Sequence, residues 1–122
     1  MYTISKEFSF SASHQLDHLP ERHKCRRLHG HNYVVTLEVS KGTLDDRGFV
    51  VDYGEMDAFR DYVETFDHQH LNDMLGSSVA TTAENLASMF LAQAVRVISR
   101  PGVLVRVCVS ETPKTKAWAG PR

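Results

Sequence analysis

The chain has 122 residues, a usual size for one domain, so we expect a single domain over residues 1–122. Its 14 basic and 15 acidic residues give a formal charge of −1, which argues against nucleic acid as the main partner. No apolar run approaches the ~18 residues of a membrane span and no signal peptide opens the sequence, so we expect a cytoplasmic protein with two reduced cysteines and no membrane partner.

The first predicted element is a strand over residues 2–14. Side chains alternate between the two faces of a strand, so every second residue lies on the same face. One face carries Phe8, Phe10, Ala12 and His14. The apolar face of this strand therefore ends in a histidine. The polar stretch 15–27, which contains Pro20, predicts a loop.

A second strand is predicted over residues 28–40, and it begins with His29-Gly30-His31. The two histidines share one face, and a glycine between them lets another backbone approach closely. If the two strands pair antiparallel, His14 meets both of them. Imidazole nitrogen is a good zinc ligand, so the geometry permits a three-histidine metal site. The alternative is a set of strand histidines that hold no metal.

The middle of the chain predicts a helix between irregular segments. Residues 41–48 indicate a turn, and 49–51 a short strand. Asp52 caps a predicted helix over 53–66, where apolar residues recur at three or four positions. The polar segment 67–73 then predicts a loop.

A second helix is predicted to start near Thr82, with Thr81 as its cap and Glu84 completing a capping box. Residues 99–102 end it. Strands follow over 103–110 and 115–119. The order ββααββ predicts an α+β domain, with an antiparallel four-stranded sheet and two helices on one face. The exposed edges of such a sheet predict a homo-oligomer formed by sheet extension.

Several short motifs occur in an order that resembles the 6-pyruvoyl-tetrahydropterin synthase superfamily. They are Phe-x-Ala-Ser-His at 10–14, Cys-x-x-x-His-Gly-His at 25–31, Val-x-Asp-Tyr at 50–53, Asp-His-x-x-Leu-Asn at 67–72 and Glu-Thr at 111–112. The cysteine three residues before His-Gly-His is similar to the spacing in the branch that makes 6-carboxytetrahydropterin. The resemblance implies the tunnelling fold, in which sheets join into a barrel, and a hexamer built as a dimer of trimers with active sites between subunits.

For the carboxy branch, the resemblance implies a zinc-dependent lyase of queuosine biosynthesis. Its substrate would be 7,8-dihydroneopterin triphosphate, and its products 6-carboxy-5,6,7,8-tetrahydropterin, acetaldehyde and triphosphate. Two alternatives stay open. One is the pyruvoyl activity, which eliminates triphosphate without carbon–carbon cleavage. The other is a non-catalytic module in which a cysteine closes the zinc site.

The resemblance also implies roles for single residues. His14, His29 and His31 would bind Zn²⁺. By its chemistry Cys25 could be a catalytic base or a fourth, closing ligand, and the resemblance favours the base. The pair Asp67 and His68 would relay protons.

The substrate would be held by residues from three parts of the chain. Glu111 would anchor the pterin, because one carboxylate can accept hydrogen bonds from an amino group and an adjacent ring N–H. Thr82 matches a pterin-side threonine, although Thr81 stands where the family pattern has proline. The triphosphate would meet basic loop residues, namely Lys24 and Arg26 with His23 and Arg27.

Overall fold

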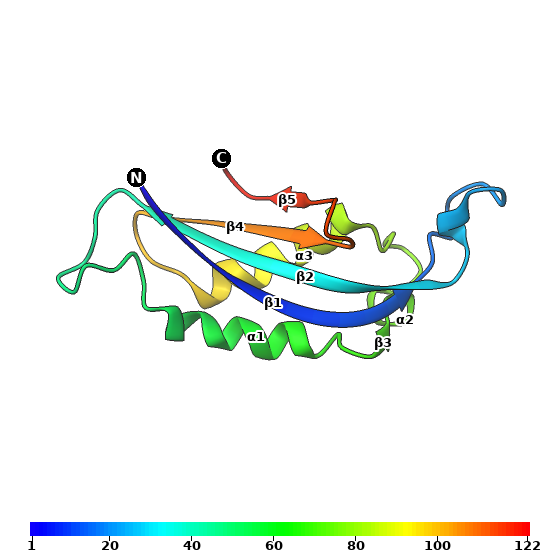
Figure 1. Ribbon diagram of the computed structural model, residues 1–122, viewed down its shortest axis with the longest axis horizontal. Helices are drawn as coiled ribbons and strands as arrows, with labels where there is room; N and C mark the ends of the chain where they lie inside the picture. The colour runs from blue at the N-terminus through cyan, green and yellow to red at the C-terminus, as the bar shows by residue number, and fades with distance from the viewer.

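A five-stranded sheet forms the framework of the domain (Figure 1). The computed structural model describes all 122 residues. Its strands are β1 (Tyr2–His14), β2 (His29–Lys41), β3 (Gln69–His70), β4 (Val103–Ser110) and β5 (Ala117–Ala119). They lie in the order β3-β1-β2-β4-β5, and β3 runs parallel to β1 while the other pairs are antiparallel. The predicted α+β class and the antiparallel pairing of the first two strands are confirmed.

The helices pack on one face of this sheet. They are α1 (Asp57–Glu64), α2 (Leu71–Leu75) and α3 (Ala83–Val97), with short 3-10 turns η1 (Lys24–Arg26) and η2 (Tyr53–Met56). Phe59 of α1 and Phe90 of α3 are fully buried and meet at 6.1 Å between ring centroids. Phe8 of β1 packs edge-on against Phe59 at 5.5 Å. The two helices therefore share one core with the apolar face of the sheet. None of the helices has the length and apolar character needed to traverse a bilayer.

Three sequence predictions in the middle of the chain are wrong. Residues 49–51 are not a strand: Val50 and Val51 are buried, but they lie in an irregular segment that pairs with no strand. Segment 67–73 is not simply a loop, because it holds β3 and the start of α2. The sheet therefore has five strands rather than four.

The cap of the second long helix also differs from the prediction. The hydroxyl of Thr82, not of Thr81, accepts the hydrogen bond from Asn85 N at 3.2 Å. Thr81 is instead fully buried. The sequence offers two adjacent threonines, and burial of the first leaves the second to cap the helix.

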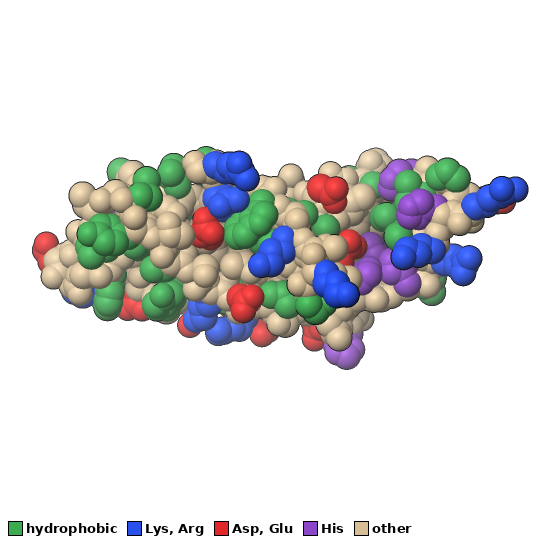
Figure 2. Space-filling view, turned by 45° about the horizontal axis from the view of Figure 1, so that its top comes forward, with side chains coloured by type: hydrophobic (Ala, Val, Ile, Leu, Met, Phe, Trp, Pro, Cys, Tyr) green, Lys and Arg blue, Asp and Glu red, His purple; other side chains and the backbone are tan.

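Most functional candidates lie at one end of the sheet (Figure 1). The loop after β1, the start of β2, and the β3–α2 segment meet there. Figure 2 shows histidine side chains gathered at this end, with Lys and Arg side chains beside them. The fold therefore brings together residues far apart in the chain, such as His14 and Thr81, which are 67 positions apart.

Candidate metal centre and active site

The strand register places three histidines on one patch of the core face. His14 lies opposite His29 across the β1–β2 ladder, and Ala12 lies opposite His31. One ligand atom from each of the three histidines lies within 4.8 Å of the others. The meeting of His14 with His29 and His31 predicted from the sequence is therefore confirmed. Gly30 allows this close pairing, since a Cβ there would lie 3.3 Å from the Ala12 carbonyl oxygen.

Hydrogen bonds to backbone carbonyls orient two of the rings. His14 Nδ1 lies 2.8 Å from the carbonyl oxygen of Thr81, and His29 Nδ1 lies 2.6 Å from that of Arg27. A carbonyl accepts only, so each Nδ1 carries the hydrogen and each Nε2 keeps its lone pair. This pattern, in which the second ring nitrogen donates to a carbonyl, is usual for histidines that bind a metal.

The histidine cluster favours neutral imidazoles. The pKa of His14 is lowered to about 4, chiefly by burial and also by the neighbouring histidines, while its bond to the Thr81 carbonyl opposes the shift. Burial also lowers the pKa of His31, with His29 adding to the effect. His14 Nε2 is buried without a hydrogen-bond partner. An unpartnered lone pair facing two more imidazoles is what a divalent transition-metal ion would satisfy, so the residues fit such an ion.

Cys25 stands outside this donor set, because the group of mutually close ligand atoms contains only the three histidines. The cysteine lies in η1 and is partly exposed. Its backbone N–H donates to His23 Nδ1 at 3.1 Å, and its carbonyl accepts from Leu16 N at 2.9 Å. The arrangement leaves the thiol free and the three-histidine set open to a further ligand.

Glu111 approaches the histidines from the end of β4. Its Oε2 lies 3.4 Å from His14 Nε2 and 3.6 Å from His31 Nε2. Burial raises the pKa of Glu111, opposed by His29. The carboxyl group also lines a cavity of about 250 Å³ between the start of α3 and the β4–β5 corner, together with Glu84. Glu111 is therefore placed between a candidate metal site and a separate cavity.

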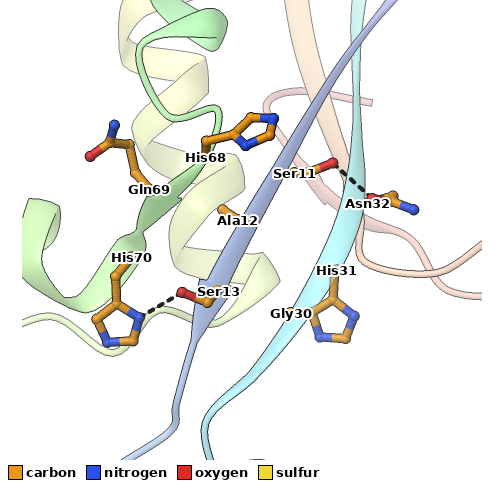
Figure 3. A pocket seen from close by; sticks show the side chains of 9 residues that line it. All are labelled: Ser11, Ala12, Ser13, Gly30, His31, Asn32, His68, Gln69 and His70. Atoms are coloured by element: carbon orange, nitrogen blue, oxygen red, sulfur yellow. Dashed lines mark hydrogen bonds between the residues drawn. The ribbon is translucent and has the colours of Figure 1, made fainter.

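Asp67 and His68 lie beside β1, at the edge of the sheet. His68 Nε2 is 3.6 Å from Asp67 Oδ2, and the His68 side chain is 84% exposed. His68 has a φ of 60°, a conformation that non-glycine residues adopt rarely. The ring lines an open polar pocket of about 610 Å³ that also includes His31 and His70 (Figure 3). One candidate metal ligand and one candidate proton carrier therefore border the same pocket.

The basic loop residues differ in what they contact. Arg26 is partly buried, and its Nη1 donates to the carbonyl oxygens of Asp17 and Leu19 at 2.8 and 2.7 Å. Lys24 and Arg27 are exposed. Arg26 therefore supports the loop, while the other two have free cationic groups.

Three residues of this region were given no role in the metal site by the sequence. Thr81 bonds to His14, and Asn72 bonds to the backbone beside His14. Tyr33 packs edge-on against His31, with 5.4 Å between the ring centroids. Two of them had a signal: Tyr33 follows His31 by two residues on the same strand face, and Asn72 is the last residue of the Asp-His-x-x-Leu-Asn motif. The Tyr33 hydroxyl is buried without a partner.

Comparisons with known proteins give a consistent family. A family model described as 6-pyruvoyl tetrahydropterin synthase matches residues 3–121. A Synechocystis protein named 6-carboxy-5,6,7,8-tetrahydropterin synthase is 39% identical over 99 residues, covering 76% of this chain and 74% of the relative. A Caenorhabditis elegans protein named putative 6-pyruvoyl tetrahydrobiopterin synthase is 32% identical over 126 residues, covering 92% and 89%.

The fold has close solved counterparts. The structure of Caenorhabditis elegans 6-pyruvoyl tetrahydropterin synthase superposes with a TM-score of 0.83 at 29% identity, covering 99% of this chain and 96% of that one. The sheet with its helices on one face is therefore the architecture of a known group of pterin enzymes.

Proposed function

Because the chain belongs to the 6-pyruvoyl tetrahydropterin synthase family, we propose that it is the carbon–carbon lyase of that family. The reaction converts 7,8-dihydroneopterin triphosphate to 6-carboxy-5,6,7,8-tetrahydropterin, acetaldehyde and triphosphate, as a step of queuosine biosynthesis. The observation that carries the proposal is the open set of three mutually close histidines, with Cys25 outside the donor set. A metal site with three histidine donors and a cysteine outside the donor set suits catalysis better than a closed structural role.

His14, His29 and His31 would hold the Zn²⁺ ion, which when bound supplies Lewis-acid polarisation of substrate side-chain oxygens. Cys25 would remove a proton from the substrate side chain. His68, oriented by Asp67, would pass protons to and from the intermediates. The exposed ring of His68 suits that role, because it can exchange protons with solvent and reach the pocket that it shares with His31.

Glu111 would bind the pterin ring through two parallel hydrogen bonds. The cavity beside its carboxyl group supports this role. Lys24 would contact the triphosphate, and Arg27 is a second candidate, because both are exposed in the segment that leads into His29. Arg26 is less suited than the sequence pattern implies, since its guanidinium already bonds two backbone carbonyls. The hydroxyl oxygen of Thr82 already accepts a hydrogen bond from Asn85 N. Thr82 would therefore contact substrate through its hydroxyl hydrogen or its remaining lone pair.

A homo-oligomer would follow from the unpaired edges of the sheet. β3 pairs with β1 only at Ala12 and Ser13, and β5 pairs with β4 only from Val107 to Val109. Beyond these short pairings, the outer edges of β1 and β4 have no strand partner within one protomer, which favours sheet extension between copies. We expect a hexamer, built as a dimer of trimers, and analytical ultracentrifugation tests it: a monomer would contradict the proposal.

The alternative activity is 6-pyruvoyl tetrahydropterin synthesis. It is favoured by the Caenorhabditis elegans relative, which matches more of the chain than the Synechocystis protein but at lower identity. Product analysis separates the two. Zinc-loaded protein is incubated with 7,8-dihydroneopterin triphosphate, and the products are identified by mass spectrometry with acetaldehyde trapped. The carboxy product with acetaldehyde supports the lyase, whereas the pyruvoyl product assigns the sister activity.

A further inference from the structure

Segment 67–72 attaches to the end of β1 through side chains as well as backbone. At its start, Asp67 Oδ1 accepts a hydrogen bond from Ser11 N at 2.8 Å, and His68 N donates to the Ser11 carbonyl oxygen at 2.6 Å. β3 then pairs with Ala12 and Ser13. Figure 3 shows β3 running beside β1, with the side chain of His70 bonded to Ser13. The attachment therefore follows β1 toward its last residue.

Asn72 continues this attachment past the last backbone pair. Its Nδ2 donates to the Gln15 carbonyl oxygen at 2.7 Å, and its Oδ1 accepts from Gln15 N at 2.9 Å. The carboxamide thus satisfies both backbone groups of one residue, as a neighbouring strand would. Both bonds are partly buried, so losing them would leave polar backbone groups without a partner. Asparagine is suited to this position because one side chain carries a donor and an acceptor side by side.

Gln15, whose backbone is hydrogen-bonded by Asn72, directly follows His14. The His14 ring is held by the Thr81 carbonyl, and the peptide after His14 is held by Asn72. We propose that Asn72 is a positioning residue of the metal centre, which keeps His14 Nε2 directed toward His29 and His31. This inference rests on the proposed metal site. The inference also gives a role to Asn72 as the last residue of the Asp-His-x-x-Leu-Asn motif. Asn72 is not one of the candidate metal ligands.

The test compares Asn72→Ala and Asn72→Leu with the wild type. Both variants remove the two bonds without adding a charge, and the leucine keeps side-chain volume in α2. Ser40→Ala is the matched control, because it removes a side-chain bond to Thr3 at the far end of the β1–β2 ladder. Zinc affinity is measured by competition with a chromophoric chelator. Amide hydrogen exchange of Gln15 is measured in the metal-free protein, and circular dichroism checks folding.

We expect zinc to bind about 10-fold more weakly to both Asn72 variants, as for other residues that orient metal ligands. The Gln15 amide should exchange faster, and Ser40→Ala should change neither result. Unchanged zinc affinity in a folded variant whose Gln15 amide exchanges faster overturns the positioning role while leaving the metal site intact. Absence of zinc binding in the wild type rejects the metal site itself. If the alanine variant does not fold, the leucine variant decides by the same two measurements.

Discussion

His14 Nδ1 lies 2.8 Å from the carbonyl oxygen of Thr81 and 3.2 Å from its hydroxyl oxygen, although 67 positions separate the two residues. Both residues are fully buried. The segment before α3 therefore fixes the tautomer of a histidine at the end of β1. A proline, which the family pattern has at this position, would keep the carbonyl but lack the hydroxyl.

Replacing Thr81 with valine tests how much the Thr81 hydroxyl contributes to zinc affinity. Thr81→Val keeps the shape and the carbonyl, so the ring of His14 should stay oriented and zinc should still bind. We expect zinc affinity to fall by less than about 10-fold, the low end for loss of a partner to a metal ligand. Chelator competition measures it. Thr65→Val is the control, since that hydroxyl bonds a backbone carbonyl away from the histidines. Complete loss of zinc would mean that the hydroxyl, not the carbonyl, orients His14.

Cys25→Ala separates the enzyme from a closed zinc module. If Cys25 is the catalytic base, the variant should keep one zinc per chain while turnover falls by about 10²–10⁴-fold. Metal content by atomic absorption and steady-state kinetics give the two readouts. Cys108→Ala is the control, because it is the other cysteine and lies buried in β4. Loss of zinc in Cys25→Ala alone would make the cysteine a ligand and reject its role as a free base.

Glu111→Gln tests whether the partly buried carboxyl group binds the pterin. The amide keeps the size of the side chain, but one carboxylate oxygen becomes an NH₂ donor, so two parallel hydrogen bonds on two oxygens are no longer possible. Charged hydrogen bonds contribute about 1.5–3 kcal/mol, so kcat/KM should fall by about 10- to 100-fold. Zinc content should not change, since the donor set contains only the histidines. Glu84→Gln, which lines the same cavity, is the control. Equal kinetics for wild type and Glu111→Gln would remove Glu111 from the binding site.

Thr82→Ala tests the revised helix cap. Loss of the hydroxyl that accepts from Asn85 N should lower the free energy of unfolding by about 1 kcal/mol. Urea denaturation measures the change, and Thr82→Ser, which keeps a capping hydroxyl, should recover most of it. An additional rise in KM for Thr82→Ala with no rise for Thr82→Ser would support contact with substrate through the same oxygen. No loss of stability would contradict the capping role.

The sequence predicts the histidine cluster well because strand geometry is periodic. His14, His29 and His31 occupy positions fixed by a period of two and by antiparallel pairing, so their meeting needs no information beyond the two strands. The same reasoning fails for β3, which has two residues and is too short to show any period.

Contacts through backbone atoms leave no signal in residue types. Thr81 orients His14 chiefly by a carbonyl that every residue has. Asn72 contacts the backbone of Gln15, so the side chain of Gln15 carries no trace of the pairing. The sequence therefore predicts the candidate ligands but not the residues that hold them in place.

Asp57→Asn should destabilise the protein in a pH-dependent way. Lys6 Nζ of β1 lies 2.8 Å from Asp57 Oδ1 of α1, and this hydrogen bond lowers the pKa of the Asp57 carboxyl below its usual 3.8. Because the folded-state pKa is the lower one, the ionised carboxylate stabilises the fold above the unfolded-state pKa. That contribution is lost as the pH falls through the folded-state value.

The gap in stability between wild type and Asp57→Asn should therefore be present at about pH 7 and shrink progressively below about pH 4. Urea denaturation of the metal-free proteins at a series of pH values measures it. Asp61→Asn on the same helix controls for loss of one negative charge, since Asp61 is exposed and makes no ion pair within 4.0 Å. Added salt should also narrow the gap, because the pair is partly exposed and is screened. A gap that stays constant across pH would show that the Lys6–Asp57 pair is not its source.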